Sequence, residues 1–166
     1  MIIRPYNEDD AVAVGELIAL TYRTFNLGFV PDAEQGLFMG PFQHAGSHER
    51  THRDAIARVI HSEMVLVAEN DGTIVGVLRG RADRLASLFV SGRWHRQGIG
   101  SRLVKRFETE CLRKGSTVLR VAATLHAVPF YLAMGYRKST GVRSGWSFEG
   151  HGLPVQPMKK VLRQAP

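Results

Sequence analysis

The segment Arg96-Gln97-Gly98-Ile99-Gly100-Ser101 contains the residues best suited to bind an anion. A loop of small residues that leads directly into a helix leaves several backbone N–H groups without intrahelical partners, and the helix dipole adds partial positive charge there. Glycine at positions 98 and 100 would let a phosphate approach these amides, and Ser101 can add a hydroxyl. The side chains nearby that can contribute positive charge are Arg93, His95 and Arg96.

This turn matches neither of two common nucleotide-binding motifs. No Gly-Lys-Ser/Thr follows four residues after a first glycine, so it is not a Walker loop. It also lacks the third glycine and the early parallel strand of a dinucleotide fingerprint. Two glycines that simply reverse the chain would explain the turn equally well, so its function depends on the elements around it.

Charge in the middle of the chain also indicates an anionic partner. Between Arg79 and Arg106, eight Lys or Arg residues face one acid, Asp83, in a chain of net charge +7. No helix-turn-helix, zinc-ligand spacing or aromatic RNA-binding strand accompanies this stripe, so we expect no nucleic acid. A phosphorylated small molecule explains the charge as well, and a merely solvated basic face is the remaining alternative.

Length and composition predict a single domain over residues 1–166. A chain of 166 residues with 44% hydrophobic and 22% charged residues can build and solubilise one core. No apolar run approaches the roughly 20 residues that span a bilayer, and the first residues do not resemble a signal peptide, so we expect a cytoplasmic protein without membrane contact. The one cysteine, Cys111, excludes internal disulfides and a multi-cysteine zinc site and is expected in the core, and we predict no metal site. A monomer and a homodimer both remain open.

Hydrophobic periodicity predicts a mixed α/β fold. Asn70-Asp71-Gly72 has the residues of a tight hairpin, and the strand, helix and strand between 84 and 122 imply a right-handed parallel crossover. We therefore expect a central, mostly antiparallel sheet of about six to seven strands with about four helices. The predicted strands are 2–4, 64–69, 73–80, 84–90, 117–122, 136–139 and 155–162, and the predicted helices run from Asn7 to about Phe25, from a cap near Ser47 or Thr51, from 99 to 113, and from 127 to 134.

Two long connections should form the walls of a pocket. Residues 26–46 are rich in glycine and proline, yet five large apolar side chains argue against disorder: Phe29, Leu37, Phe38, Met39 and Phe42. The glycine-rich connection 141–154 offers Trp146 and Phe148 as lining residues. Trp146 could equally cap the core or pack at a dimer contact.

Two motifs make the chain resemble the GNAT acyltransferase superfamily. Residues 88–101, Leu-Phe-Val-Ser-Gly-Arg-Trp-His-Arg-Gln-Gly-Ile-Gly-Ser, look like the family's fourth strand and its Q/R-x-x-G-x-G/A pyrophosphate loop. Residues 127–136, Ala-Val-Pro-Phe-Tyr-Leu-Ala-Met-Gly-Tyr, are similar to its A-x-P-F-Y-x-x-x-G-F/Y helix. The predicted order of elements fits the family along nearly all of the chain.

The resemblance implies an N-acetyltransferase that uses acetyl-CoA to acetylate a primary amine of a small molecule or peptide. It implies that Tyr131 is the general acid that protonates the departing thiolate, although a half-buried packing role would also explain this residue. Main-chain groups of the fourth strand would bind the pantetheine arm, and the turn would bind the diphosphate. The cofactor-binding residues implied are Leu88, Phe89, Val90, His95, Arg96, Gln97, Gly98, Ile99, Gly100 and Ser101, with Phe130 packing beside them.

Two positions depart from the family pattern, and one role has no residue. His95 stands where the motif usually has Gln or Arg, and Ala122 stands where many relatives have Asn. The strand 84–90 contains no Asp or Glu, so the amine would lose its proton to water or to a histidine such as His61 or His126. A non-catalytic acyl-CoA sensor or interaction module is the alternative function, followed by a basic RNA or DNA binder.

Overall fold

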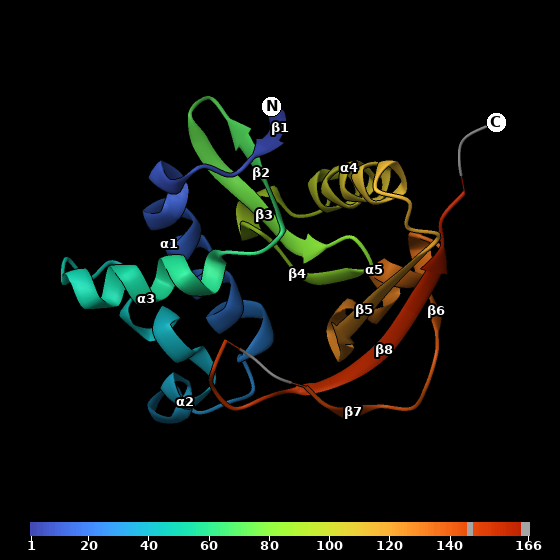
Figure 1. Cartoon of the computed structure of the whole chain (residues 1–166). Helices are drawn as coiled ribbons and strands as arrows, with labels where there is room; N and C mark the ends of the chain where they lie inside the picture. Colours follow the sequence, from blue (N-terminus) through green and yellow to red (C-terminus); the bar gives the residue numbers. More distant parts are fainter. Residues whose placement is uncertain (146–147, 164–166) are drawn as a thin grey trace.

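The computed structural model describes residues 1–145 and 148–163, which form one mixed sheet of eight strands (Figure 1). The strands are β1 (Ile2–Pro5), β2 (Met64–Asn70), β3 (Thr73–Arg81), β4 (Arg84–Val90), β5 (Val118–Thr124), β6 (Arg137–Lys138), β7 (Arg143–Ser144) and β8 (Pro154–Val161). Their order is β1-β2-β3-β4-β5-β8-β6, and β7 also pairs with β8. This arrangement confirms the predicted mixed, mostly antiparallel sheet.

The parallel pair β4 and β5 is joined over only a short length. The two strands pair at Arg84↔Arg120 and Leu85↔Val121, whereas every other adjacent pair is antiparallel. Beyond Leu85 they diverge, so the green half of the sheet in Figure 1 separates from the half that holds β5 and β8. A gap therefore opens in the middle of the sheet.

A β-bulge precedes this gap. Arg79 pairs with Ser87 and Gly80 with Leu85, so Ala86 is an extra residue in β4. Gly80 is needed here because a Cβ atom on it would lie 2.5 Å from the carbonyl oxygen of Arg84. A bulge increases local twist and turns later side chains to the opposite face. Accordingly Leu85 lies in the core under α4, whereas Phe89 lies in the core under α1.

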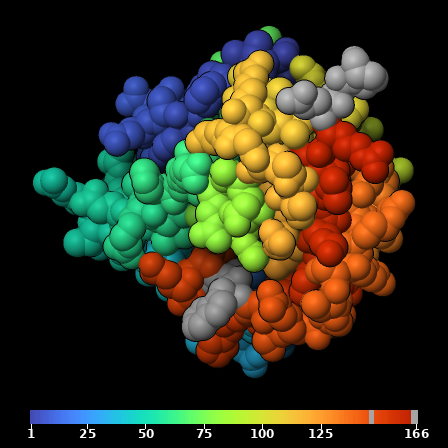
Figure 2. All heavy atoms as spheres, turned by 45° about the vertical axis from the view of Figure 1, so that its right-hand side comes forward, coloured from blue at the N-terminus to red at the C-terminus, as the bar shows by residue number. Residues whose placement is uncertain are grey.

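Helices cover both faces of the sheet. Their bounds are α1 (Ala11–Thr21), α2 (Gly36–Met39), α3 (Arg50–Ile60), α4 (Ile99–Arg113) and α5 (Val128–Ala133). One core contains residues of α1 and α3, and the other contains residues of α4 and α5. Figure 2 shows the light green residues near 80 between α3, in teal, and the yellow to red C-terminal half.

Helix α4 shows why the sequence forms this layer. Its fully or almost fully buried side chains recur at helical spacing, which places one face on the sheet; they are Ile99, Leu103, Val104, Phe107 and Cys111. Burial raises the pKa of the Cys111 thiol to about 11, so this cysteine is neutral at pH 7. Its predicted place in the core is confirmed.

Several predicted boundaries were wrong. The first helix gives way after Thr21 to a π-helical turn, Tyr22–Asn26, and α3 starts at Arg50 with Glu49 as its N-cap. The segment expected to be a loop contains α2 and two 3-10 turns, Asp32–Glu34 and Gly40–His44. Strand β7 was not predicted because two residues carry no detectable alternation.

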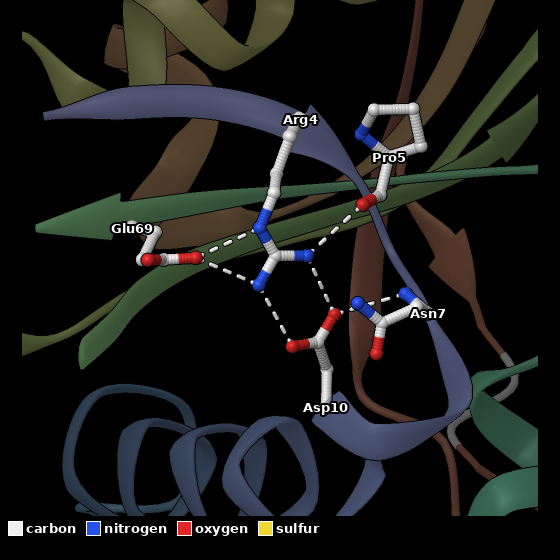
Figure 3. A network of polar contacts seen from close by, with 5 residues as sticks. All are labelled: Arg4, Pro5, Asn7, Asp10 and Glu69. Atoms are coloured by element: carbon white, nitrogen blue, oxygen red, sulfur yellow. Dashed lines mark hydrogen bonds and ion pairs between the residues drawn. The ribbon is translucent and has the colours of Figure 1, made fainter. Parts of the chain in front are cut away.

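A polar network attaches the N-terminal strand to its neighbours (Figure 3). Arg4 donates twice to the carboxylate of Asp10 at 2.8 Å, and its Nε donates to Glu69 at 2.7 Å. Asp10 also accepts from the backbone N–H of Asn7 at 2.9 Å. These contacts join β1, β2 and the start of the first helical segment. The hydrogen bonds from Arg4 hold the pKa of Asp10 below its ordinary value.

Across residues 1–145 and 148–163, none of the helices has both the length and the apolar composition needed to cross a membrane.

Candidate active site

The gap between β4 and β5 opens into a cavity of about 820 Å³. Its lining comes from both faces of the sheet, so the cavity passes through the sheet at the point where the strands diverge. On one side the lining residues are Thr21, Tyr22, Phe25, Asn26 and Val59, and on the other they include Gly100, Ser101, Phe130 and Tyr131. Ligands could therefore enter from opposite faces and meet beside β4.

The main chain of β4 offers hydrogen-bonding groups to this gap. The N–H of Ser91 donates to the carbonyl of Val75 at 2.9 Å. Because alternate residues of an antiparallel strand direct both groups to the same neighbour, Leu88 and Val90 direct theirs away from β3 and toward the gap. The Val90 carbonyl accepts a hydrogen bond from His95 Nε2 at 2.7 Å, so this nitrogen must carry a proton.

The start of α4 forms one end of the cavity. Gly98 is the N-cap, with φ 78° and ψ 6°, and its carbonyl accepts from the Arg102 N–H at 3.0 Å. The amides of residues 99–101 precede this first helical bond and have no acceptor within the helix. A Cβ atom on Gly98 would have no atom within 4 Å, so this side of the backbone is open.

Phe130 packs against the second glycine of the turn. A Cβ atom on Gly100 would lie 3.4 Å from the Phe130 ring and 3.7 Å from the Leu88 side chain. The aromatic ring therefore packs over the first turn of α4, as expected for a residue that shapes the site. A Cβ atom would make ordinary contact with this ring, so a side chain longer than that of alanine would be needed to crowd it.

The structure brings most of the predicted cofactor-binding residues together. Those that line the cavity are Leu88, Phe89, Val90, His95, Arg96, Gly98, Ile99, Gly100, Ser101 and Phe130. Gln97 does not line it, because its side-chain amide turns back to donate to the Arg93 carbonyl at 3.0 Å. Phe89 contributes from the opposite face, where its ring packs edge-on against Tyr22 with the centroids 6.1 Å apart.

Tyr131 lies on α5 in the wall of the same cavity. Its side chain is 5% exposed, and its ring packs edge-on against Phe130 and Tyr136, with centroids 5.1 and 5.4 Å away. The hydroxyl makes no hydrogen bond within the described part of the chain, where every fully buried side-chain polar atom has a partner. The hydroxyl therefore reaches the cavity. Burial raises the pKa of Tyr131 above its ordinary value, so the phenol stays protonated.

The described lining of the cavity contains no carboxylate to act as a base. None of its described lining residues is Asp or Glu, and residues 1–145 and 148–163 contain no cluster of three metal-binding side chains. His126 lines the cavity, and burial, followed by the charge of His95, lowers its pKa. His61 lies outside the cavity, in a second depression beside Tyr6, so it is not a candidate base. Ala122, which stands where many relatives have Asn, contributes an uncharged, apolar side chain to the cavity wall.

The predicted pocket walls are partly correct. From 141–154 the cavity is lined by Gly145, Leu153 and Phe148, which confirms the prediction for Phe148; Trp146 lies outside the described residues. From 26–46 only Asn26 lines it, so that prediction was wrong for most of the segment. Phe42 instead packs behind the Phe148 ring, at a centroid distance of 4.8 Å.

Sequence reasoning missed Arg79 as a residue of this site. Its Nε donates to the Ile60 carbonyl at 2.9 Å, Nη1 donates to Ser87 Oγ at 3.3 Å, and Nη2 donates to the Val59 carbonyl. Burial lowers its pKa, and the side chain lines the cavity. The charge stripe therefore does not form one surface, since Arg81 pairs on the exterior with Asp83 at 3.0 Å.

Comparisons with known proteins agree with this geometry. A sequence model described as the acetyltransferase (GNAT) domain matches residues 31–162. A search of curated protein sequences finds no match.

Solved acetyltransferases share the fold at low sequence identity. The paia N-acetyltransferase from Thermoplasma acidophilum, in complex with coenzyme A, is 17% identical with a TM-score of 0.71, and 96% of this chain and 98% of that chain are covered. An aminoglycoside 6'-N-acetyltransferase complexed with coenzyme A is 16% identical with a TM-score of 0.63, over 100% of this chain and 99% of that one. The ribosomal-protein-alanine N-acetyltransferase from Brucella melitensis is 21% identical with a TM-score of 0.63, over 98% and 100%. Because the family match extends over well more than half of the sequence, the chain belongs to the GNAT acetyltransferase family.

Proposed function

We propose that the protein transfers an acetyl group from acetyl-CoA to a primary amine of a small molecule or peptide by direct attack of the amine on the thioester. One observation carries this proposal: a single cavity joins the free amides at the start of α4, the main chain of β4 and the hydroxyl of Tyr131. The two similar structures that contain coenzyme A support the choice of cofactor.

The residues at the start of α4 fit a diphosphate. Unpaired amides and the helix dipole favour an anion there, and the open side of Gly98 leaves room for one. Arg96 adds donors at the same end of the cavity, whereas the Nε2 donor of His95 is already bonded to the Val90 carbonyl. A cavity of about 820 Å³ lies within the usual range of about 300–1,000 Å³ for ligand sites.

Two groups of the chain would then act on the reacting atoms. When bound, acetyl-CoA supplies an acyl thioester whose acetyl carbon accepts the amine nitrogen. The Val90 N–H, directed to the gap, donates to the thioester carbonyl oxygen and stabilises the charge that develops there. As the C–S bond breaks, the Tyr131 hydroxyl donates its proton to the sulfur, and the phenol regains a proton from the solvent.

The acceptor amine enters from the α1 and α3 side in its neutral form. Since the described lining contains no carboxylate, we assign to water both the proton that the ammonium loses before attack and the second proton that the nitrogen loses as the amide bond forms. The burial that keeps Tyr131 protonated thus serves the leaving group, while the nucleophile depends on its own basicity.

The test is incubation with acetyl-CoA and a panel of primary amines, with release of free thiol as the readout. Gly98→Asp is the matched control, because aspartate tolerates a positive φ but places negative charge at the diphosphate site. We expect the wild-type protein to release thiol only when an amine is present, and we expect Gly98→Asp to lose this activity. Tight binding of acetyl-CoA without turnover of any amine would indicate a non-catalytic acyl-CoA-binding module instead.

A further inference from the structure

Arg79 brings a partly buried cation to the side of the cavity that faces α1 and α3. Its three hydrogen bonds go to the carbonyls of Val59 and Ile60 and to Ser87 Oγ. A guanidinium has five N–H groups, so one remains on each of Nη1 and Nη2. A carboxylate can bridge this pair of nitrogens. Arg79, Val59 and Ser87 all line the cavity.

The charge of Arg79 has no carboxylate partner in the described part of the chain. Burial is the one influence on its pKa, with no contribution from an acid. The carbonyls at the end of α3 carry partial negative charge and offset part of the cost of burying the cation. A charge that is partly removed from water without a counter-ion carries a cost, and a counter-ion reduces that cost. A ligand anion would complete this site.

The walls around Arg79 restrict what else the ligand contains. Tyr22 and Phe148, which pack edge-on with their centroids 5.3 Å apart, supply aromatic surface on this side of the cavity, and none of the described lining residues is acidic. An apolar body fits these walls. A polycation would meet like charge at Arg79 and would find no carboxylate.

We propose that Arg79, assisted by Ser87, binds a carboxylate of the acceptor, so that the substrates are small amines with an apolar body and a carboxylate. This inference rests on the proposed function and names its acceptor class. Ser87 lies next to Leu88, whose main-chain groups face the cofactor side of the gap. At a rise of about 3.3 Å per residue, the carboxylate and the thioester would lie within the reach of one short molecule.

Matched acceptors test the inference on the wild-type protein. The panel pairs each ω-amino acid, from β-alanine to 6-aminohexanoate, with its carboxamide and with the alkylamine of equal length. Because a carboxylate would form a hydrogen-bonded charge pair with Arg79, we expect its kcat/KM to be roughly 10- to 100-fold higher than that of the matched carboxamide or alkylamine. The ratio should be largest at one chain length. An aminoglycoside represents the polycationic class and should be a poor acceptor.

Variants identify the residue responsible. Arg79→Gln should reduce the carboxylate preference to about twofold or less, because no charge remains to pair. Arg81→Gln is the control, since Arg81 lies two residues away on β3 but pairs with Asp83 on the surface. It should keep the full preference. If Arg79→Gln does not fold, Ser87→Ala replaces it and should lower the preference severalfold, because it removes one partner that positions the guanidinium.

A binding arm separates this inference from the proposed function. Protein saturated with coenzyme A is heated with 6-aminohexanoate or with its amide, and the shift in Tm is recorded for wild type and Arg79→Gln. If 6-aminohexanoate raises the Tm of wild type and does not raise that of Arg79→Gln, the anion site is supported even when no amine is acetylated. Equal kcat/KM and equal Tm shifts for carboxylates and amides, or a preference that survives in folded Arg79→Gln, would overturn it.

Discussion

Replacing Tyr131 by phenylalanine separates chemistry from packing at this site. The ring would keep its edge-on contacts with Phe130 and Tyr136, whose centroids lie 5.1 and 5.4 Å away. The hydroxyl has no partner in the described residues, so the free energy of unfolding should change by less than about 0.5 kcal/mol. Loss of a general acid lowers kcat by about 10² to 10⁴, which corresponds to about 3–5 kcal/mol of barrier.

Tyr136→Phe is the matched control. Its hydroxyl donates to Glu108 at 3.0 Å, and Lys160 donates to the same carboxylate at 2.8 and 2.9 Å. Removal of this hydroxyl should cost about 1.5–3 kcal/mol of stability, since the acceptor is charged, and leave kcat within about twofold.

The assay for both variants combines steady-state thiol release, calorimetric titration with coenzyme A and urea unfolding. Tyr131→Phe should keep its affinity for coenzyme A and its stability while losing turnover. Because burial raises the pKa of Tyr131 above its ordinary value of about 10, wild-type kcat should not fall through this group below that pH. Unchanged turnover in Tyr131→Phe would refute the assignment of the proton donor.

Three further predictions concern the network at the N-terminus, the bulge and the missing base. Asp10→Asn should lower the free energy of unfolding by about 1–3 kcal/mol at pH 7, measured by urea unfolding. The pKa of Asp10 is lower in the folded protein than the value of about 3.9 in the unfolded chain, so the ionised carboxylate stabilises the fold at pH values above about 3.9. This stabilisation disappears as the pH falls through the folded pKa, where variant and wild type should become equally stable. Gly80→Ala should lower the free energy of unfolding by about 1–3 kcal/mol or more, because its Cβ would lie 2.5 Å from the Phe107 ring. Gly141→Ala is the control: its Cβ would meet nothing within 4 Å, so the same denaturation experiment should show no change in stability. With water as proton acceptor, kcat/KM should rise with pH to the pKa of each amine tested, and a plateau at one common pH for all amines would indicate an enzymic base instead.

The turn at α4 and most strands were predictable because their signals are local. Glycines before a helical pattern indicate a candidate anion site, and the strand predicted over 84–90 has the bounds found for β4. The opening of the sheet was not predictable in this way. It depends on the bulge in β4, where one extra residue lies opposite Arg79 and Gly80 of β3. Such a bulge is set by how two strands pair, which the pattern within either strand does not reveal.

Arg79 and the segment 26–46 show the same limit. A charged residue after an apolar run usually marks solvent, but β3 has helices on both faces, so Arg79 turns to the carbonyls at the end of α3. Gly80 in the interior of a strand was the available signal, since such glycines often mark bulges or close approaches. In 26–46 the apolar content was recognised, yet Met39 and Phe42 are fully buried in the core instead of lining the cavity.

Calorimetric titration with coenzyme A tests the central claim most directly, namely that amides at the start of α4 bind the diphosphate. The titration is run with coenzyme A and with pantetheine, which lacks the diphosphate together with the attached adenosine 3'-phosphate, on wild type, Gly98→Asp and its neutral isostere Gly98→Asn. Both variants tolerate φ 78°, so they differ in charge alone. We expect wild type to bind coenzyme A at least about 100-fold more tightly than pantetheine, and Gly98→Asp to bind it more weakly than Gly98→Asn. Equal affinity for coenzyme A and pantetheine, or no effect of the aspartate, would contradict the account.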